Sequence, residues 1–349
     1  MDKVLSIIIP SYNMEGYIAK CVESLICEVL SDLDVIIVND GSRDETLQIA
    51  QSFAERYPDS ISVINKENGN YGSCINAALK VAQGKYVKVL DADDSFNTSQ
   101  LPDFVAFLKN VETSVVVSDY VIVNELGETT ETITFSDKIN DKILSFRDAT
   151  VILGHEMFQM HAVTYRLNLL KQIDYKQTEG ISYTDQEWMF TPMALAESIS
   201  IYTGVIYKYL VGRAGQTIDT NVSYRAVNQT MQVMESLMIR FKALQPLIDS
   251  EQRNYLICRL YQKIPSIYRI SLLKTIDNAA RKRLRSFDEN LMSLNNEIYG
   301  QLDNETVGKL PYHFISHWRK SGRQDGPVFL AFVRLIISQL LLPIQVKKQ

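Results

Sequence analysis

Strand-like and helix-like segments alternate along the first 95 residues. The strand-like segments are short apolar runs, typical of strands buried on both faces of a parallel sheet, at residues 4–10, 34–38, 61–65 and 86–90. The intervening segments carry apolar residues at helical spacing, at residues 14–29, about 42–57 and about 70–81. This β-α-β-α-β-α-β alternation predicts a parallel sheet with helices on both faces.

Beyond residue 95 the alternation becomes irregular. A helix is expected over 101–108, and strongly β-forming residues fill 115–123. Residues 128–135 follow a turn, so they are expected to form an antiparallel excursion over the sheet. Further elements are expected as a strand over 158–165, a helix from about Leu167, a helix capped by Thr184 or Asp185, and a strand over 201–210.

From residue 223 onward the pattern is helical, with segments at 227–244, 252–273 and 277–298. We therefore expect a catalytic domain at residues 1–220 and a helical region at 221–349. The chain ends in an almost wholly apolar stretch, within residues 327–346, that contains Arg334. A spanning helix would place this arginine in hydrocarbon, so peripheral contact with a membrane is favoured over spanning. Packing on the protein itself, or in a homodimer, is the alternative.

Composition narrows the class of protein. Apolar residues make up 46% of the chain and charged residues 22%, a normal globular balance. The net charge of −5 gives no electrostatic case for a nucleic acid partner. The four cysteines form no Cys-x-x-Cys pair, and the N-terminus runs directly into a strand-like segment without a signal-peptide pattern. A cytoplasmic protein, peripheral at most to the inner face of the membrane, is expected.

Acidic residues follow the fourth predicted strand. Asp91, Ala92 and Asp93 form an Asp-x-Asp sequence at its C-terminal end, which is the end of an open α/β sheet where ligands bind. Two such carboxylates can share Mg²⁺ or Mn²⁺, with phosphate oxygens completing the coordination. An acidic turn without a metal is the alternative, because aspartate is common in turns.

Polar turns also follow the earlier strands, at residues 11–13, 39–42 and 68–73. The last is glycine-rich and leads into a helix, an arrangement that suits a phosphate but also occurs in ordinary loops. No Gly-x-Gly-x-x-Gly follows the first strand and no Gly-Lys-Ser/Thr is present. These absences count against a dinucleotide-binding Rossmann domain and a P-loop nucleotidase.

Four motifs in this order resemble those of family 2 glycosyltransferases with the GT-A fold. They are Ser-Ile-Ile-Ile-Pro-Ser-Tyr-Asn at 6–13, Val-Asn-Asp-Gly-Ser-Arg-Asp at 38–44, Asn-Gly-Asn-Tyr-Gly-Ser-Cys-Ile-Asn at 68–76 and Leu-Asp-Ala-Asp-Asp at 90–94. The resemblance covers roughly residues 1–215. It implies a mixed sheet flanked by helices and an inverting, metal-dependent transferase that uses a nucleotide-diphosphate sugar.

The resemblance also implies roles for single residues. Pro10, Tyr12 and Asp40 would contact the base and ribose, and Asp91 and Asp93 the ribose and metal. The remaining nucleotide-sugar contacts expected from these motifs are Asn13, Asn68, Gly72, Asn76 and Ala92.

Two departures from the family pattern accompany these motifs. Asn39 stands where a second acid is frequent, and Cys74-Ile75 replaces a small residue followed by arginine. The glycine-containing loop at 211–217 resembles a family loop that closes over the diphosphate. Arg213 in it is suited to bidentate phosphate contact, or else is a solvated surface residue.

The segment at 179–188 resembles the acidic segment that precedes the family's acceptor-side helix. Asp185 is the expected general base, with Glu187 as the fallback, although helix capping alone would also explain both acids. Trp188 is either a platform for a sugar face or part of the core. His161, alone on a strand-like segment, is either structural or close to the acceptor or diphosphate.

Together these features predict a hexosyl- or N-acetylhexosaminyltransferase. It would move the sugar from a UDP-sugar to a hydroxyl of a growing glycan or lipid-linked glycan, with Mn²⁺ or Mg²⁺ and an aspartate base. A nucleotidyltransferase is the rival within the fold, but a glycine-rich basic loop would be expected where residues 11–13 stand. A non-catalytic scaffold that binds nucleotide-sugars is the rival of another class.

Overall fold

The computed structural model describes residues 3–135, 143–154, 159–213, 227–274, 278–307 and 310–323. The chain groups into two compact units. The first contains residues 1–219 and 247–256, and the second contains residues 220–246 and 257–349. The predicted division into folding domains at residue 220 stays a prediction.

The first unit is built on one mixed sheet with the order β3-β2-β1-β4-β9-β6-β10-β5, to which β7 adds beside β6 and β8 beside β10. Its strands are β1 (Leu5–Ser11), β2 (Leu33–Asp40), β3 (Ile61–Lys66), β4 (Tyr86–Val89), β5 (Ser95–Phe96), β6 (Val115–Val123), β7 (Thr129–Ile133), β8 (Leu144–Ser145), β9 (Val163–Arg166) and β10 (Ser198–Leu210). The strands β1 to β4 are parallel, whereas β9 runs antiparallel to both of its neighbours.

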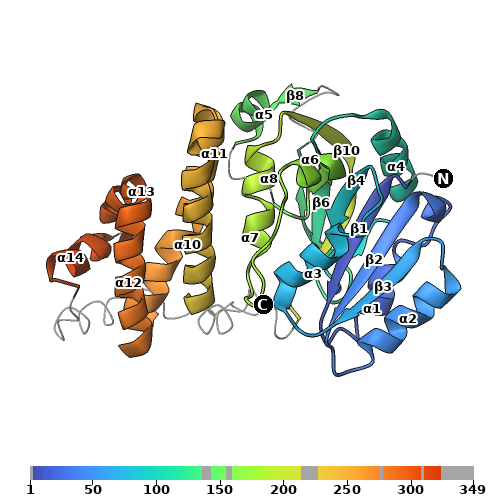
Figure 1. Ribbon diagram of the computed structural model, residues 1–349, viewed down its shortest axis with the longest axis horizontal. Coiled ribbons are helices and arrows are strands. Elements are labelled where there is room, and N and C mark those ends of the chain that lie inside the picture. Colours follow the sequence, from blue (N-terminus) through green and yellow to red (C-terminus); the bar gives the residue numbers. More distant parts are fainter. Residues whose placement is uncertain are drawn as a thin grey trace, which may run out of the picture. The chain divides into compact units, whose positions relative to one another are not determined.

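Helices of the first unit connect these strands (Figure 1). They are α1 (Ile18–Glu23), α2 (Thr46–Arg56), α3 (Asn70–Leu79), α4 (Leu101–Asn110), α5 (Phe146–Leu153), α6 (Leu167–Gln172), α7 (Asp185–Trp188) and α8 (Thr191–Ala194). The chain steps from β1 to β3 in one direction and returns to β4. Right-handed crossovers therefore place α1 and α2 on one face of the sheet and α3 on the other.

Glycine permits the close approach of β4 to β1. A Cβ atom at Gly84 would lie 2.3 Å from the backbone nitrogen of Ser6, so a larger residue would push the two strands apart. The apolar runs of β1 and β2 are buried on both faces, with Ile7, Ile8 and Ile36 fully inaccessible. The predicted parallel arrangement of the first four strands is thereby confirmed, and it brings their carboxyl ends to one edge.

Later elements match the sequence prediction less closely. The antiparallel excursion is confirmed, because β7 pairs with β6. The helix predicted over 14–29 is limited to α1, at Ile18–Glu23. The acceptor-side helix is interrupted, since α7 ends at Trp188 and α8 starts at Thr191. Pro192 lies in the first turn of α8, and proline lacks the N–H that a continuous helix would need there.

The second unit is mainly helical. Its elements are α10 (Val227–Leu244), the later part of α11 (Ser250–Arg269), α12 (Asn278–Leu294), α13 (Asn296–Gln301), β11 (Thr306–Val307), β12 (Leu310–His313) and α14 (Phe314–Lys320). A buried ionic cluster joins α12 to α14, because Arg319 of α14 bonds the fully buried Asp288 of α12 at 2.7 Å. Arg323, which follows α14, bonds the same carboxylate at 2.8 Å.

No helix in the described part of the chain is both long enough and apolar enough to cross a bilayer. The predicted membrane contact through residues 327–346 lies outside the described residues.

Candidate active site

The loops after β1 and β2 are tied together at the edge of the sheet. The Asn13 side-chain oxygen accepts a hydrogen bond from the Arg43 backbone N–H (2.9 Å), and the Asn13 N–H donates to the Ser42 hydroxyl (3.0 Å). Asn13 has a φ of +53°, a conformation that asparagine adopts more readily than most residues. Next to it, Tyr12 is 43% exposed, while Pro10 is half-buried near the end of β1.

Asp40 ends β2 in a dense polar cluster at the start of α3. Its buried carboxylate pairs with Lys66 at 2.6 Å and accepts a hydrogen bond from the Gly69 N–H at 2.9 Å. The Asn68 side chain donates to the Asp40 backbone carbonyl at 2.9 Å. The structure thus brings the predicted residues Asp40 and Asn68 together. Lys66 joins the end of β2 to the start of α3, because it bonds both Asp40 and Ser73. This lysine was not among the residues predicted from the sequence.

Asn39, one of the two departures from the family pattern, contacts the neighbouring strand β3. Its side-chain amide donates to the Asn65 side chain at 2.8 Å, across the register that joins β2 to β3. The amide at this position therefore links two strands. The other departure, Cys74, is buried in α3, and burial raises the pKa of its thiol to about 12.

Helix α3 links the polar cluster around Asp40 to the acids that follow β4. The Tyr71 hydroxyl donates a hydrogen bond to Asp91 Oδ1 at 3.0 Å. Tyr71 also lies close enough to Asp185 for that charge to raise the pKa of the phenol, although burial raises it more. Tyr71 is therefore bonded to Asp91 and lies within the electrostatic influence of Asp185, the two acids that were predicted on opposite sides of the reaction.

Gly72 and Asn76 dock α3 onto the segment that leads to Asp185. A Cβ at Gly72 would lie 2.1 Å from the Thr178 backbone oxygen, so only glycine permits this contact. The Asn76 amide donates to the Gln177 carbonyl at 2.8 Å, and its oxygen accepts from the Gln177 N–H at 2.8 Å. Both predicted nucleotide-binding residues thus have structural contacts here. A direct contact with nucleotide stays a prediction.

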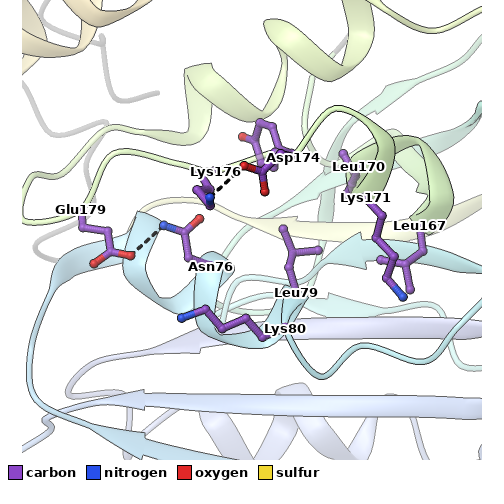
Figure 2. Close-up of a pocket in the computed structure, with 10 residues that line it drawn as sticks. Asn76, Leu79, Lys80, Leu167, Leu170, Lys171, Asp174, Lys176 and Glu179 are labelled. Atoms are coloured by element: carbon purple, nitrogen blue, oxygen red, sulfur yellow. Dashed lines mark hydrogen bonds and ion pairs between the residues drawn. The ribbon is translucent and has the colours of Figure 1, made fainter.

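A pocket of about 280 Å³ lies beside this contact, between α3 and α6. Figure 2 shows Asn76 bonded to Glu179 at one side of it, at 2.8 Å, with Leu79 and Lys80 further along the helix. Lys176 pairs with Asp174 at 2.8 Å on the opposite wall (Figure 2). The pocket adjoins the segment carrying Asp185, but no predicted catalytic or metal residue lines it.

Asp185 opens α7 at the end of that segment. Backbone and side-chain contacts hold the segment to the start of α3: the Gly180 N–H donates to the Gly69 carbonyl at 2.8 Å, and the Ser182 hydroxyl donates to Asn70 Oδ1 at 3.3 Å. Asp185 itself is half-buried and accepts a hydrogen bond from the Gln186 amide at 2.8 Å.

The two other residues singled out in this segment are buried. Glu187 is fully buried, and its carboxylate accepts hydrogen bonds from the Thr178 N–H (2.7 Å) and hydroxyl (2.6 Å). Trp188 is 1% exposed and packs edge-on against Tyr165, so it belongs to the core and is no platform for a sugar. Asp185 is therefore the more accessible of the two candidate bases.

The acids after β4 crowd together. Burial raises the pKa of Asp91 to about 7, and the neighbouring Asp93 adds to the rise. Asp93 pairs with Arg213 at 2.6 Å, so the predicted phosphate-binding arginine lies at the predicted metal ligand. Ala92 between the acids is buried. Asp94 is also buried and accepts hydrogen bonds from the Tyr207 hydroxyl (2.6 Å) and the Leu210 N–H (2.7 Å).

A histidine and a lysine complete this cluster from neighbouring strands. His161, just before β9, stacks on Tyr209 with ring centroids 4.2 Å apart, and burial lowers the pKa of its imidazole to about 3. The fully buried Lys88 donates to the carbonyls of His161 (2.7 Å) and Val163 (3.2 Å). Burial lowers the pKa of Lys88 to about 7.

The arrangement fits a divalent cation. The ligand atoms of Asp91, Asp94 and His161 all lie within 4.8 Å of one another, and Asp93 is paired with a cation, the Arg213 guanidinium. The raised pKa of Asp91 has its cause in burial beside another carboxylate, a penalty that a bound cation would offset. Carboxylate oxygens with an imidazole nitrogen are suitable ligands for Mn²⁺.

Part of the first unit matches a known protein family. A family model described as Glycosyl transferase family 2 matches residues 6–171. Residues 6–171 belong to family 2 of the glycosyl transferases. The predicted family is thereby confirmed.

Two relatives illustrate how far this chain resembles known proteins. The uncharacterized glycosyltransferase EpsJ of Bacillus subtilis is 42% identical over 94 residues, which are 27% of each chain. The poly(ribitol-phosphate) beta-N-acetylglucosaminyltransferase TarS of Staphylococcus aureus is 30% identical over 221 residues, 60% of this chain and 36% of TarS. The chain therefore matches about a quarter of the first relative and about a third of the second.

A solved structure confirms the fold. The crystal structure of S. aureus TarS residues 1–349 in complex with UDP-GlcNAc superposes with a TM-score of 0.68. It covers 96% of this chain and 92% of that one at 20% identity. The predicted GT-A architecture, a mixed sheet flanked by helices and followed by a helical C-terminal region, is correct.

Several residues of this site were not selected from the sequence. They are Lys66, Tyr71, Lys88, Asp94, Tyr207 and Tyr209. Asp94 and Tyr71 stand inside the quoted motifs, so motif position was a usable signal for them. Lys88 was also detectable, because a charged residue in the middle of a buried apolar strand requires buried partners. Tyr207 and Tyr209 gave no signal, since tyrosines are common in strands.

Proposed function

We propose that this chain is an inverting glycosyltransferase that moves a hexose or N-acetylhexosamine from a UDP-sugar to a hydroxyl of a growing glycan. The observation that carries the proposal is the convergence of Asp185 and Asp91 around Tyr71. An inverting transfer needs a base on the acceptor side and charge neutralisation on the leaving-group side. These two groups come from distant parts of the sequence, and the charge of Asp185 acts on both Tyr71 and Asp91.

Asp185 would act on the acceptor. Its carboxylate accepts the proton of the acceptor hydroxyl while the oxygen attacks the anomeric carbon, and the bond from that carbon to the β-phosphate oxygen breaks. The electron pair of that bond leaves with UDP. The base must lie within about 3 Å of the proton it receives, and the accessible position of Asp185 at the start of α7 permits this contact.

Asp91 and Asp93 would hold a divalent cation against the diphosphate. Mn²⁺ or Mg²⁺, when bound, neutralises negative charge that develops on the departing UDP. Arg213 would add a guanidinium contact to the same phosphates. Its present pairing with Asp93 at 2.6 Å keeps it within reach of that position.

The nucleotide would lie over the carboxyl ends of β1 and β2. Pro10, Tyr12 and Asp40 are proposed to contact the base and ribose, because they border the same edge of the sheet. The exposed ring of Tyr12 is suited to packing against a planar base. The remaining proposed contacts are Asn13, Asn68, Gly72, Asn76 and Ala92.

Relatives support the substrate class. TarS is named a poly(ribitol-phosphate) beta-N-acetylglucosaminyltransferase, and its superposed structure contains UDP-GlcNAc. We propose by analogy that this chain uses a UDP-sugar in surface polysaccharide or glycolipid assembly, on a glycan or lipid-linked glycan.

The test is UDP release from a panel of UDP-sugars with Mn²⁺, with and without candidate acceptors. Release with at least one donor, stimulated by an acceptor, is expected. Binding of UDP without release from any donor would favour the non-catalytic scaffold. Formation of a nucleotide-sugar from a sugar 1-phosphate and a nucleoside triphosphate would instead identify a nucleotidyltransferase.

We further propose a cytoplasmic enzyme that contacts the inner face of the membrane through residues 327–346. The support is the apolar sequence of that stretch, followed by Lys347 and Lys348. Cosedimentation with anionic liposomes at low salt, lost on deletion of residues 327–349, is the expected result. Absence of binding by the full chain would favour a packing helix, in the chain itself or in a homodimer.

A further inference from the structure

The His161 imidazole is fixed beside the acids of the site. Its ring stacks on Tyr209 at 4.2 Å and lies 4.8 Å from the Tyr207 ring, measured between centroids. The backbone is held as well, because Lys88 donates to the His161 carbonyl at 2.7 Å. In the described part of the chain, no hydrogen bond to either ring nitrogen is found. Packing therefore orients this ring and leaves its nitrogens available to a ligand.

The neighbouring carboxylates differ in their availability. Both oxygens of Asp94 accept hydrogen bonds, one from Tyr207 and one from Leu210. Asp91 accepts only the Tyr71 hydroxyl, through Oδ1, among the described contacts of its carboxylate. Asp91 therefore has an oxygen to offer beside His161, whereas Asp94 is committed to holding Tyr207 and the end of β10.

The spacing suits a shared ion. The ligand atoms of Asp91, Asp94 and His161 lie within 4.8 Å of one another. Opposite ligands of an ion with bonds of about 2.1 Å stand about 4.2 Å apart. Comparison of these two distances shows that side-chain shifts of well under 1 Å would let a carboxylate oxygen and the imidazole nitrogen bind the same ion.

We propose that His161 is a direct ligand of the divalent cation, beside Asp91. The inference rests on the metal-assisted transfer proposed above and adds a nitrogen donor to a site that the sequence motif supplies with oxygens alone. Lys88 is then a positioning residue, because its bond to the His161 carbonyl fixes the backbone from which the ring projects. An imidazole ligand favours Mn²⁺ over Mg²⁺, since Mg²⁺ prefers oxygen donors.

The test uses the full-length protein with saturating UDP and Mn²⁺. Electron spin echo envelope modulation of the bound Mn²⁺ detects a directly coordinated ¹⁴N nucleus, and we expect this signal in the wild type. His161→Phe should remove it, because phenylalanine keeps the ring packing against Tyr209 and supplies no nitrogen. His313→Phe is the matched control at an exposed histidine of the second unit, and it should retain the signal.

Affinity gives a second readout that is independent of turnover. Titration calorimetry in the presence of UDP should show Mn²⁺ affinity about 10-fold or more lower in His161→Phe, the scale of losses at metal sites. Mg²⁺ affinity should fall less, so the preference for Mn²⁺ should shrink. UDP affinity without metal should match the wild type, which would show that the variant is folded.

The outcomes separate this inference from the proposed function. Joint binding of Mn²⁺ and UDP with no ¹⁴N coupling, and with unchanged affinity in His161→Phe, would overturn the histidine ligand and leave carboxylate coordination. Failure of the wild type to bind UDP and Mn²⁺ together would instead contradict the metal-assisted transfer itself.

Discussion

The proposed nucleotide side of the site, residues 1–95, and the proposed acceptor-side segment, residues 174–188, are held by different kinds of contact. Parallel strands β1 to β4 fix the nucleotide side through continuous backbone pairing. The acceptor-side segment is instead held by single contacts with α3 and by side-chain bonds within itself.

Positive φ values occur in both regions but lie closer together in the acceptor-side segment, because residues 1–95 spread Asn13, Gly41 and Asn70 over three separate segments. Asp174, Gly180 and Tyr183 all have positive φ values in the acceptor-side segment, of +45°, +79° and +67°. Conformations of this kind cost free energy in residues other than glycine and persist only where surrounding contacts enforce them. The position of Asp185 therefore depends on a few identifiable contacts, whereas the positions of residues on the proposed nucleotide side depend on the whole sheet. Substitutions can therefore separate nucleotide binding from transfer.

The largest effect is expected from Asp93→Ala on the nucleotide side. Turnover should be abolished, and UDP binding should weaken only when Mn²⁺ or Mg²⁺ is present, because the carboxylate acts through the cation. Steady-state kinetics and calorimetry with and without EDTA measure both effects. Glu23→Ala, at an exposed acid of α1, is the control and should behave as wild type. Full activity of the wild-type enzyme in EDTA would contradict the prediction.

Asp185→Asn on the acceptor side should reduce the turnover number by about 10²-fold or more, the usual contribution of a positioned base. Metal-dependent UDP binding should be unchanged, since other strands build the nucleotide side. Glu187→Gln is the informative comparison, because that carboxylate is fully buried on Thr178. It should lower the melting temperature. Normal turnover in Asp185→Asn would show that the base lies elsewhere.

Gly72→Ala tests the contact between the two regions. The added Cβ would lie 2.1 Å from the Thr178 oxygen, so the segment must move. We expect a loss of about 1–3 kcal/mol in the free energy of unfolding, as for other overpacked sites, and a fall in turnover larger than the fall in UDP affinity. Gly16→Ala meets no atom within 4 Å and is the matched control. Equal behaviour of the two variants in urea unfolding would count against this docking contact.

The smallest effect is expected in the pH dependence of the free energy of unfolding, to which Lys88 contributes. Burial lowers its pKa to about 7 in the folded protein, below the value of 10.5 for an exposed lysine. Between these values the unfolded chain binds more protons, so stability should rise with pH, by up to about 1.4 kcal/mol per pH unit. Urea unfolding from pH 7 to 9 measures the slope. Lys88→Met should have a flatter profile, and parallel profiles would show that Lys88 does not lose its proton there.

The sequence by itself determined the arrangement of the first four strands. Buried strands have recognisable apolar runs, and their carboxyl ends must meet at one edge of a parallel sheet, so the placement of Asp40 and Asp91 followed from the pattern of residues 1–95. The same local reasoning identified Asp185 as a helix-opening acid.

Tertiary structure alone decided what these residues touch. Lys66 pairs with Asp40 and His161 approaches Asp91, and the residues of each pair lie 26 or more positions apart in the sequence. The burial of Glu187 depends on tertiary packing. Periodicity reports which face of an element is buried, and it contains no information about the partner across a sheet or between a helix and a loop. For that reason the sequence placed His161 on a strand-like segment, while its neighbours Tyr207, Tyr209 and Asp91 became visible only in the folded sheet, where β9 pairs with β4 and the Tyr207 hydroxyl of β10 accepts a hydrogen bond from the Asp91 N–H.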